Sequence, residues 1–363
     1  MRICVIGGMI DAKLVAKLAP LQNLSEVEII DLIRRNEFQG PKVKCHSPPK
    51  TLLKWLPLAE AWRIMALIWV VLRHKPELLV AFGTVPHGVY AWLVGRLFRI
   101  SVIQHVMGKN DLRLTFPGQK GKGITLAAVR AGNMIAVRGH RMKQWLETMG
   151  VPPEKVFIQH NIHDFTLFTP RPGQAKDYEL IYVGLLAPYK RIDLMLEMLQ
   201  VLKKKGKKPR LLLVGDGPQK KALEETARQL EIDRQVEFAG NKKFSDLPPL
   251  YQRAKVFIMT SQGEGLPQAM IEAMSCGLPT IVPADADIEE VARHGVNALV
   301  VNPPTAEAFA QATERLLSEK SLFKQLHEGA LQTREEYRNK YSLTYQTKSW
   351  AKVIRCLTSD NLP

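Results

Sequence analysis

The sequence predicts an α/β protein with two tandem domains, each built on a doubly wound parallel sheet. At 363 residues the chain is long for a single hydrophobic core. Its 46% hydrophobic and 24% charged content excludes an intrinsically disordered chain. Short apolar runs alternate with longer amphipathic stretches, and this alternation restarts after a polar, proline-bearing connection at residues 160–177. The restart is the feature that predicts a second domain.

The first half contains buried-type strands separated by helical stretches. Apolar runs at residues 2–7, 27–32, 77–82, 101–106 and 134–137 predict strands. Stretches 52–74, 88–98 and 140–150 predict helices, the last closed by Gly150 and the prolines that follow it. This order predicts a Rossmann-like domain.

The second half repeats the pattern. Strands are predicted at residues 178–184, 210–217, 235–240, 255–260, 278–283 and 297–301, with helices between them. A basic run, KKKGKK at 203–208, lies where a helix should end, and cations suit the negative end of the helix dipole. We therefore interpret it as a solvated turn.

The charge is basic and unevenly distributed. The net charge is +16, and residues 1–170 hold 23 Lys and Arg against 11 Asp and Glu, which leaves +12 in the first half. Such a field attracts an anionic partner: nucleic acid, a phospholipid surface or a phosphorylated substrate.

The cysteines and the hydropathy bound the location. The four cysteines are scattered, without a close pair or a neighbouring histidine cluster, which favours a reducing compartment and argues against a disulfide framework or structural zinc. The clean apolar run from Ile64 to Leu72 is far shorter than the roughly 20 residues that span a bilayer. We expect a cytoplasmic protein that does not cross a membrane.

The segment GEGLPQAMIEAMSCGLP, residues 263–279, carries most of the chemistry. It follows a predicted strand, and Pro267 suits the first turn of a helix running through Met274. Ligands of such folds bind at the carboxyl ends of the strands. The glycines permit a close backbone approach, and a helix start favours a diphosphate. Glu264 and Glu272 could then accept hydrogen bonds from hydroxyl groups at the two ends of an extended ligand.

This segment resembles the signature of the retaining family 4 glycosyltransferases of GT-B fold, whose hallmark is a Glu-x7-Glu pair. Other stretches are similar to the same family: YVGLLAPYKRIDLMLEML, the glycine turn LLLVGDGP at 211–218, the connection at 151–170 and the last helix at 341–354. The resemblance implies an acceptor domain at 1–165, a nucleotide-sugar domain at 166–340, a cleft between them, and a C-terminal helix in 341–363 packed on the first domain.

The resemblance also implies roles for individual residues. Glu272 would hold the ribose hydroxyls of a nucleotide-sugar, and Glu264 a hydroxyl of the transferred sugar. Lys190 would neutralise charge on the departing diphosphate. The implied catalytic set is His105, Glu264 and Lys190, and the implied donor-binding set is Gly7, Gly8, Lys190, Arg191, Gly215, Asn241, Gly265, Leu266 and Glu272.

His87, Lys109 and Asp111 are candidates for contacting the acceptor, with Asn110 and Arg113 nearby. His105 taken alone is also typical of a satisfied buried histidine, and His87 of a helix cap. No metal and no other cofactor is implied for the reaction.

Two features depart from the family. Leu185 stands where the family usually has Arg, which leaves either weaker donor binding or another basic residue, such as Arg191, in that role. Asp285 and Asp287 form an Asp-x-Asp string that marks a metal site in an unrelated transferase fold. Asp287 followed by Glu290 fits a helix N-cap, and we favour that interpretation.

The sequence therefore predicts a retaining hexosyltransferase that uses a UDP- or GDP-linked sugar and a hydroxyl acceptor, such as a lipid-linked or cell-surface glycan. Trp55, Trp62 and Trp69 recur at seven-residue spacing, which suits either an anionic membrane surface or packing on the sheet. Alternatives are a non-catalytic nucleotide-sugar-binding protein and a basic nucleic-acid-binding protein. The second lacks an aromatic-interleaved basic motif. A dinucleotide oxidoreductase is disfavoured because no G-x-G-x-x-G follows the first strand.

Overall fold

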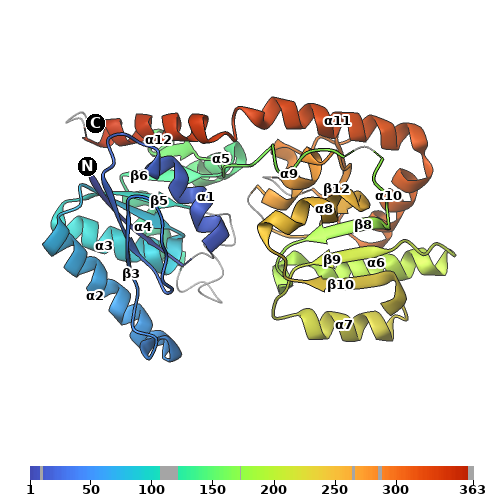
Figure 1. Cartoon of the computed structure of the whole chain (residues 1–363), viewed down its shortest axis with the longest axis horizontal. Helices are drawn as coiled ribbons and strands as arrows, with labels where there is room; N and C mark the ends of the chain where they lie inside the picture. The colour runs from blue at the N-terminus through green and yellow to red at the C-terminus, as the bar shows by residue number, and fades with distance from the viewer. Residues whose placement is uncertain (9–10, 107–121, 172, 264–265, 285–287, 359–363) are drawn as a thin grey trace. The chain divides into compact units, whose positions relative to one another are not determined.

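The computed structural model describes residues 1–8, 11–106, 122–171, 173–263, 266–284 and 288–358 (Figure 1). The chain divides into two compact units. The first joins Met1–Ile162 to Tyr341–Pro363, and the second is His163–Lys340. Each unit is an α/β domain with one parallel sheet, so the predicted fold class is confirmed.

The first unit has a seven-stranded sheet in the order β3-β2-β1-β4-β5-β6-β7. Its strands are β1 (Arg2–Gly7), β2 (Ile29–Ile33), β3 (Val43–His46), β4 (Leu78–Phe82), β5 (Ser101–His105), β6 (Met134–Val137) and β7 (Val156–Ile158). Every neighbouring pair is parallel. The chain therefore needs a crossover connection between successive strands.

Helices cover both faces of this sheet. They are α1 (Asp11–Gln22), α2 (Leu56–His74), α3 (Val89–Phe98), α4 (Lys122–Ala131), α5 (His140–Thr148) and α12 (Leu343–Thr358). Ile3 and Val5 of β1 pack in the core that includes Trp350 of α12, whereas Cys4 and Ile6 pack with Leu67 of α2. Alternate residues of one strand thus fill two cores, as the pleat of a strand requires. The C-terminal helix belongs to the first unit.

The second unit has a six-stranded parallel sheet in the order β10-β9-β8-β11-β12-β13. Its strands are β8 (Tyr178–Val183), β9 (Leu211–Val214), β10 (Val236–Gly240), β11 (Ala254–Ile258), β12 (Thr280–Pro283) and β13 (Ala298–Val301). Its helices are α6 (Ile192–Lys204), α7 (Lys220–Gln229), α8 (Leu247–Gln252), α9 (Gln268–Ser275), α10 (Ala306–Ser318) and α11 (Lys320–Arg338). The KKKGKK run begins in the last turn of α6, as predicted.

The strand order reverses direction at one point in each sheet. This point lies between β1 and β4 in the first unit and between β8 and β11 in the second. Connections leave the sheet on opposite sides there, so the loops at the carboxyl ends diverge and leave room for a ligand. Both places are therefore candidate sites.

Some local predictions needed correction. The predicted helix at 52–74 is a short turn, Leu52–Lys54, followed by α2 from Leu56. Pro267 is the N-cap of α9, not part of its first turn.

Candidate functional site

Three loops meet at the carboxyl edge of the second sheet. The Leu186 amide, after β8, donates to the Asp216 carbonyl after β9 at 3.0 Å. The Gln262 amide, after β11, donates to the Tyr189 carbonyl at 2.9 Å. The Thr260 hydroxyl donates to the Arg191 carbonyl at 2.7 Å. These bonds fix the backbone around the β8–β11 switch point.

Gly215 is required by the closeness of these loops. Its φ of +141° is a conformation that residues with side chains rarely adopt. A Cβ at this position would lie 1.8 Å from the Gly184 carbonyl oxygen. The glycine turn suggested by the sequence is thus explained by backbone packed on backbone.

Glu272 lies in the second turn of α9 and is only 5% exposed. Its carboxylate accepts a hydrogen bond from the Tyr251 hydroxyl of α8 at 2.8 Å. Burial, together with the Glu272 charge, raises the pKa of Tyr251 well above its usual value, so the phenol stays protonated and donates. The carboxylate is held in one place by a neutral donor.

The segment entering the second unit fixes α9 at both ends. His163 bonds with the Ser275 hydroxyl at 2.9 Å through Nε2, and with the Gln268 amide group at 3.0 Å through Nδ1. Burial lowers the pKa of His163 to about 3, so the ring is neutral. A neutral imidazole has one donor and one acceptor nitrogen, which matches these two partners.

The loop after β8 carries the predicted basic pair. Lys190 ends a short turn, and its ammonium group lies 5.2 Å from the centre of the Tyr189 ring. Arg191 forms an ion pair with Asp193, at 3.0 Å. Leu185, at the position where an arginine was expected, is 49% exposed. Hence this loop presents one ammonium group, one paired guanidinium and one exposed leucine.

The other predicted donor residues are placed as follows. Leu266 is buried just before α9. Asn241 is exposed in the loop after β10, next to Gly240, whose carbonyl accepts the Gly215 amide at 2.9 Å. Glu264, Gly265, Asp285 and Asp287 lie outside the described residues.

In the first unit, His87 and Gly8 come together at the β1–β4 switch point. A Cβ on Gly8 would lie 3.0 Å from the His87 ring, so the glycine gives the ring its space. Gly7 ends β1 beside Phe82. The Arg63 guanidinium bonds to His87 Nε2 at 2.9 Å, and burial followed by this charge lowers the pKa of His87 to about 4. The ring is neutral and accepts from Arg63.

His105 ends β5 and is 1% exposed. The Lys17 ammonium lies 2.8 Å from its Nε2, and both side chains lie beside the Phe82 ring. Burial, then the charges of Lys17 and Arg138, lower the pKa of His105 well below its usual value. The adjoining cavity of about 10 Å³ has room for one water molecule and none for a sugar. The catalytic role of His105 stays a prediction.

Lys109 and Asp111 lie outside the described residues, as do Asn110 and Arg113. The structure also brings in residues that sequence reasoning missed: Tyr251, His163, Lys17 and Arg63. The only signal for any of them was Arg63, which interrupts an otherwise apolar helical stretch. A charge in that position is typical of a buried partner or of a solvated face, and the sequence does not distinguish the two.

Residues 167–333 match the family described as glycosyl transferases group 1. The chain is 30% identical over 174 residues to the Escherichia coli (strain K12) protein WcaL, named as a colanic acid biosynthesis glycosyltransferase, which covers 46% of this chain and 43% of WcaL. It is 26% identical over 233 residues to a Homo sapiens protein that is named as part of phosphatidylinositol N-acetylglucosaminyltransferase, covering 64% and 46%. The chain thus spans less than half the length of these relatives.

Solved structures share the fold across the whole chain. The Anabaena protein HepE, solved with UDP and glucose, superimposes with a TM-score of 0.80 at 15% identity, covering 98% of this chain and 99% of that one. At this identity the likeness shows the fold alone, which is the GT-B arrangement of two Rossmann-like domains.

Proposed function

We propose that this protein is a retaining glycosyltransferase that moves a hexose from a UDP- or GDP-linked sugar to a hydroxyl group of a glycan or lipid-linked acceptor. The observation that carries the proposal is the buried carboxylate of Glu272, fixed by Tyr251 beside the switch point of the second sheet. The matches to glycosyltransferases over this unit support it.

The donor binds on the second unit. Glu272 accepts hydrogen bonds from the ribose diol, and Lys190 neutralises the diphosphate, with the backbone at Gly215 approaching it closely. Asn241 and Arg191 border the same edge, and Gly265 and Leu266 complete the pocket. Donor charge on this unit is therefore met by one ammonium and by backbone N–H groups.

Transfer needs neither a metal nor a covalent intermediate. As the glycosidic bond breaks, the electron pair goes to the phosphate oxygen, and that oxygen takes the proton of the attacking acceptor hydroxyl on the same face of the sugar. Lys190 stabilises the growing negative charge. Glu264 orients the sugar, and His105 acts from the first unit, where Gly7, Gly8, His87, Lys109 and Asp111 meet phosphate or acceptor.

The test is the Glu272→Gln variant. The amide keeps an oxygen for Tyr251 but removes the charge, so UDP or GDP affinity should fall about 10- to 150-fold, the equivalent of about 1.5–3 kcal/mol. Isothermal calorimetry measures the change. The exposed Glu197 of α6 supplies the matched control, Glu197→Gln. Unchanged nucleotide affinity in Glu272→Gln contradicts the ribose assignment.

Leu185 favours a second candidate, a nucleotide-sugar-binding protein without turnover. The exposed leucine removes one charge from the diphosphate site at the position where the resembling family carries arginine. Both candidates predict nucleotide binding. Release of UDP or GDP from the matching nucleotide-sugar in the presence of acceptor distinguishes them, because only the transferase gives product.

A helix of the first unit offers a surface for a membrane-bound acceptor. Within the described residues, no helix combines the length and apolar content that crossing a bilayer requires. However, α2 exposes apolar side chains at intervals of three, four or seven residues along one face: Trp55, Leu58, Met65, Trp69 and Leu72. Trp62, on the same face, packs partly on the core. The predicted packing of this face on the sheet is therefore true of Trp62 and not of its neighbours.

This exposed face suits a lipid surface, since the first 170 residues carry +12 and attract anionic headgroups. Co-sedimentation with vesicles containing phosphatidylserine tests it at low salt. The Leu58→Ser, Met65→Ser double variant should lose most of the binding, and Val296→Ser, an exposed apolar change in the second unit, should not. Absence of wild-type binding at low salt rejects the surface.

A further inference from the structure

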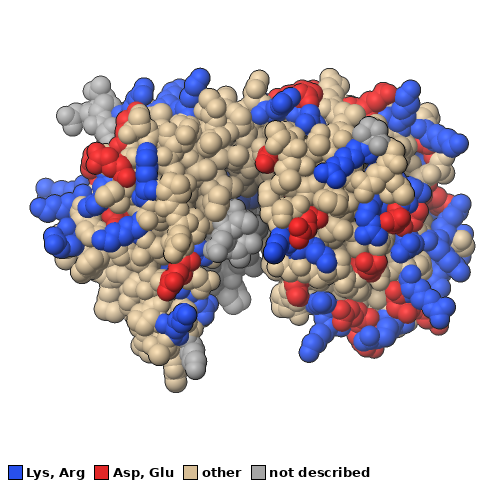
Figure 2. All heavy atoms as spheres, viewed as in Figure 1, with Lys and Arg blue, Asp and Glu red and all other residues tan. Residues whose placement is uncertain are grey.

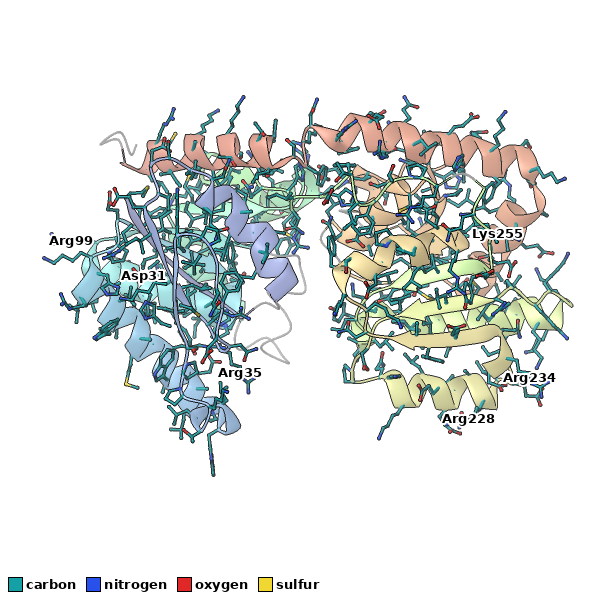
Figure 3. All side chains as sticks on the ribbon, viewed as in Figure 1. Asp31, Arg35, Arg99, Arg228, Arg234 and Lys255 are labelled. Atoms are coloured by element: carbon teal, nitrogen blue, oxygen red, sulfur yellow. The ribbon has the colours of Figure 1, made fainter. Side chains whose placement is uncertain are left out.

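Three potential metal ligands meet on the first unit, away from the residues assigned above. Asp31 lies in β2, His46 ends β3, and His74 is the last residue of α2. The Asp31 Oδ1 atom lies 2.9 Å from His46 Nε2 and 2.9 Å from His74 Nδ1. The three ligand atoms all lie within 4.8 Å of one another. Asp31 is labelled in Figure 3.

We propose that Asp31, His46 and His74 form a binding site for a divalent transition-metal ion, with Zn²⁺ as the best fit. Two imidazole nitrogens and one carboxylate oxygen form a set that Zn²⁺ binds readily, with water completing the coordination. Calcium and magnesium prefer all-oxygen sets and are disfavoured here. The site is separate from the proposed transfer chemistry, which uses no metal.

The present geometry is close to what a zinc ion needs. Ligands at about 2.0–2.1 Å from a tetrahedral zinc are about 3.4 Å apart. Each Asp31–histidine distance is therefore short by about half an ångström, and the two hydrogen bonds would be exchanged for metal bonds. Because the three residues sit on neighbouring strands and a helix end, they are already held together before any ion arrives.

The second oxygen of Asp31 is an independent indication. Asp31 is fully buried, and among the described residues Oδ2 accepts no hydrogen bond. Arg2 lies nearby, with Nε 3.5 Å from Oδ2, and its guanidinium also bonds to the His74 carbonyl at 3.4 Å. A buried carboxylate with a spare oxygen is costly unless something uses it.

Access and local fields also suit a cation. The side chains of His46 and His74 are 12% and 11% exposed, so an ion can reach them from solvent. His74 is at the C-terminus of α2, where the helix dipole is negative. Trp69 lies edge-on to both rings, with centroids 5.7 Å from His46 and 5.1 Å from His74. Arg2 is the opposing charge and limits the affinity.

Calorimetric titration of the untagged, metal-stripped chain with Zn²⁺ tests the site. Wild type should bind one ion per chain, and Asp31→Asn and His74→Gln should each weaken it by 100-fold or more. His140→Gln, at an exposed histidine of the same unit, should bind as wild type does. Full Zn²⁺ affinity in His74→Gln overturns the proposal.

A second measurement leaves all three ligands intact. Cu²⁺ quenches indole emission at short range, so Cu²⁺ bound here should quench Trp69 first among the six tryptophans. Trp69→Phe should abolish the saturable quenching while keeping the metal stoichiometry, and Trp145→Phe should not. Equal quenching in Trp69→Phe and wild type, or no saturable binding of either ion by wild type, overturns the proposal.

Discussion

The carboxyl edges of the two sheets hold opposite chemistry at equivalent places in the fold. In the first unit, two buried histidines are each bonded to a cation, His87 to Arg63 and His105 to Lys17. In the second unit, a buried carboxylate, Glu272, is bonded to a neutral phenol, Tyr251. Both arrangements keep a titratable group in one protonation state by burial.

This difference indicates what each edge can recognise. Neutral histidines with cationic donors leave a positive edge, which suits anions and oxygen acceptors, whereas a fixed carboxylate suits hydroxyl donors such as a ribose diol. The surface charge follows the same division. Residues 1–170 carry +12 and the remainder +4, and Figure 2 shows acidic and basic side chains intermixed over the second unit.

The largest expected effect breaks the second edge by way of its backbone. Gly215→Ala places a Cβ 1.8 Å from the Gly184 carbonyl oxygen at a φ of +141°. Backbone strain and overpacking each cost about 1–3 kcal/mol, so the free energy of unfolding should fall by about 3 kcal/mol or more, with loss of nucleotide binding. Denaturant unfolding and calorimetry measure both.

Gly206→Ala is the matched control, because Gly206 also has positive φ, +76°, but nothing lies within 4 Å of its Cβ position. It should cost about 1 kcal/mol and leave nucleotide binding intact. If the two variants were equally stable, the close approach of the loops after β8 and β9 would be wrong.

The next effect tests the first edge through pH. The pKa of His87 is about 4 when folded against 6.5 ordinarily, so the unfolded chain binds more protons between these values and stability falls as pH drops through this window. From pH 7 to pH 5 this group should cost about 2 kcal/mol. Unfolding free energies of wild type and His87→Gln should therefore diverge in pH dependence by that amount.

His140→Gln, at an exposed histidine, should keep the wild-type pH dependence. Comparing variants is necessary because Asp31 also has a lowered pKa: burial raises it, but hydrogen bonds and charges from His46 and His74 lower it more. Its contribution is lost at still lower pH and is common to wild type and both variants. An identical pH slope in His87→Gln would mean that His87 is not buried neutral.

The sheets were predictable because their strands are apolar on both faces. Runs such as Leu78–Phe82 and Leu211–Val214 are fully buried and stand out from the amphipathic stretches around them. The four-residue β3 was missed because Val43–His46 is an edge strand with polar residues. The three-residue β7 is too short to show a period.

The site was predictable only where it is local in sequence. Glu272 and Gly215 sit in segments whose glycines and strand ends mark them out. Tyr251 and His163 were missed because their contacts with α9 depend on tertiary packing: the Tyr251–Glu272 bond joins residues 21 apart and the His163–Ser275 bond residues 112 apart. The Asp31 cluster was missed for the same reason, since its ligands come from three separate elements and follow no metal-binding spacing.

The smallest expected effect sharpens the comparison by adding charge to the second edge. Leu185 is 49% exposed beside the loop that carries Lys190, so Leu185→Arg can be accommodated without repacking. A second cation should tighten UDP or GDP binding about 3- to 10-fold, and less at high salt, because the new interaction is partly exposed. Leu185→Gln matches the change in polarity without the charge and should bind as wild type does. Equal affinities for Leu185→Arg and Leu185→Gln would place the diphosphate away from this loop, and with it the proposed role of Lys190.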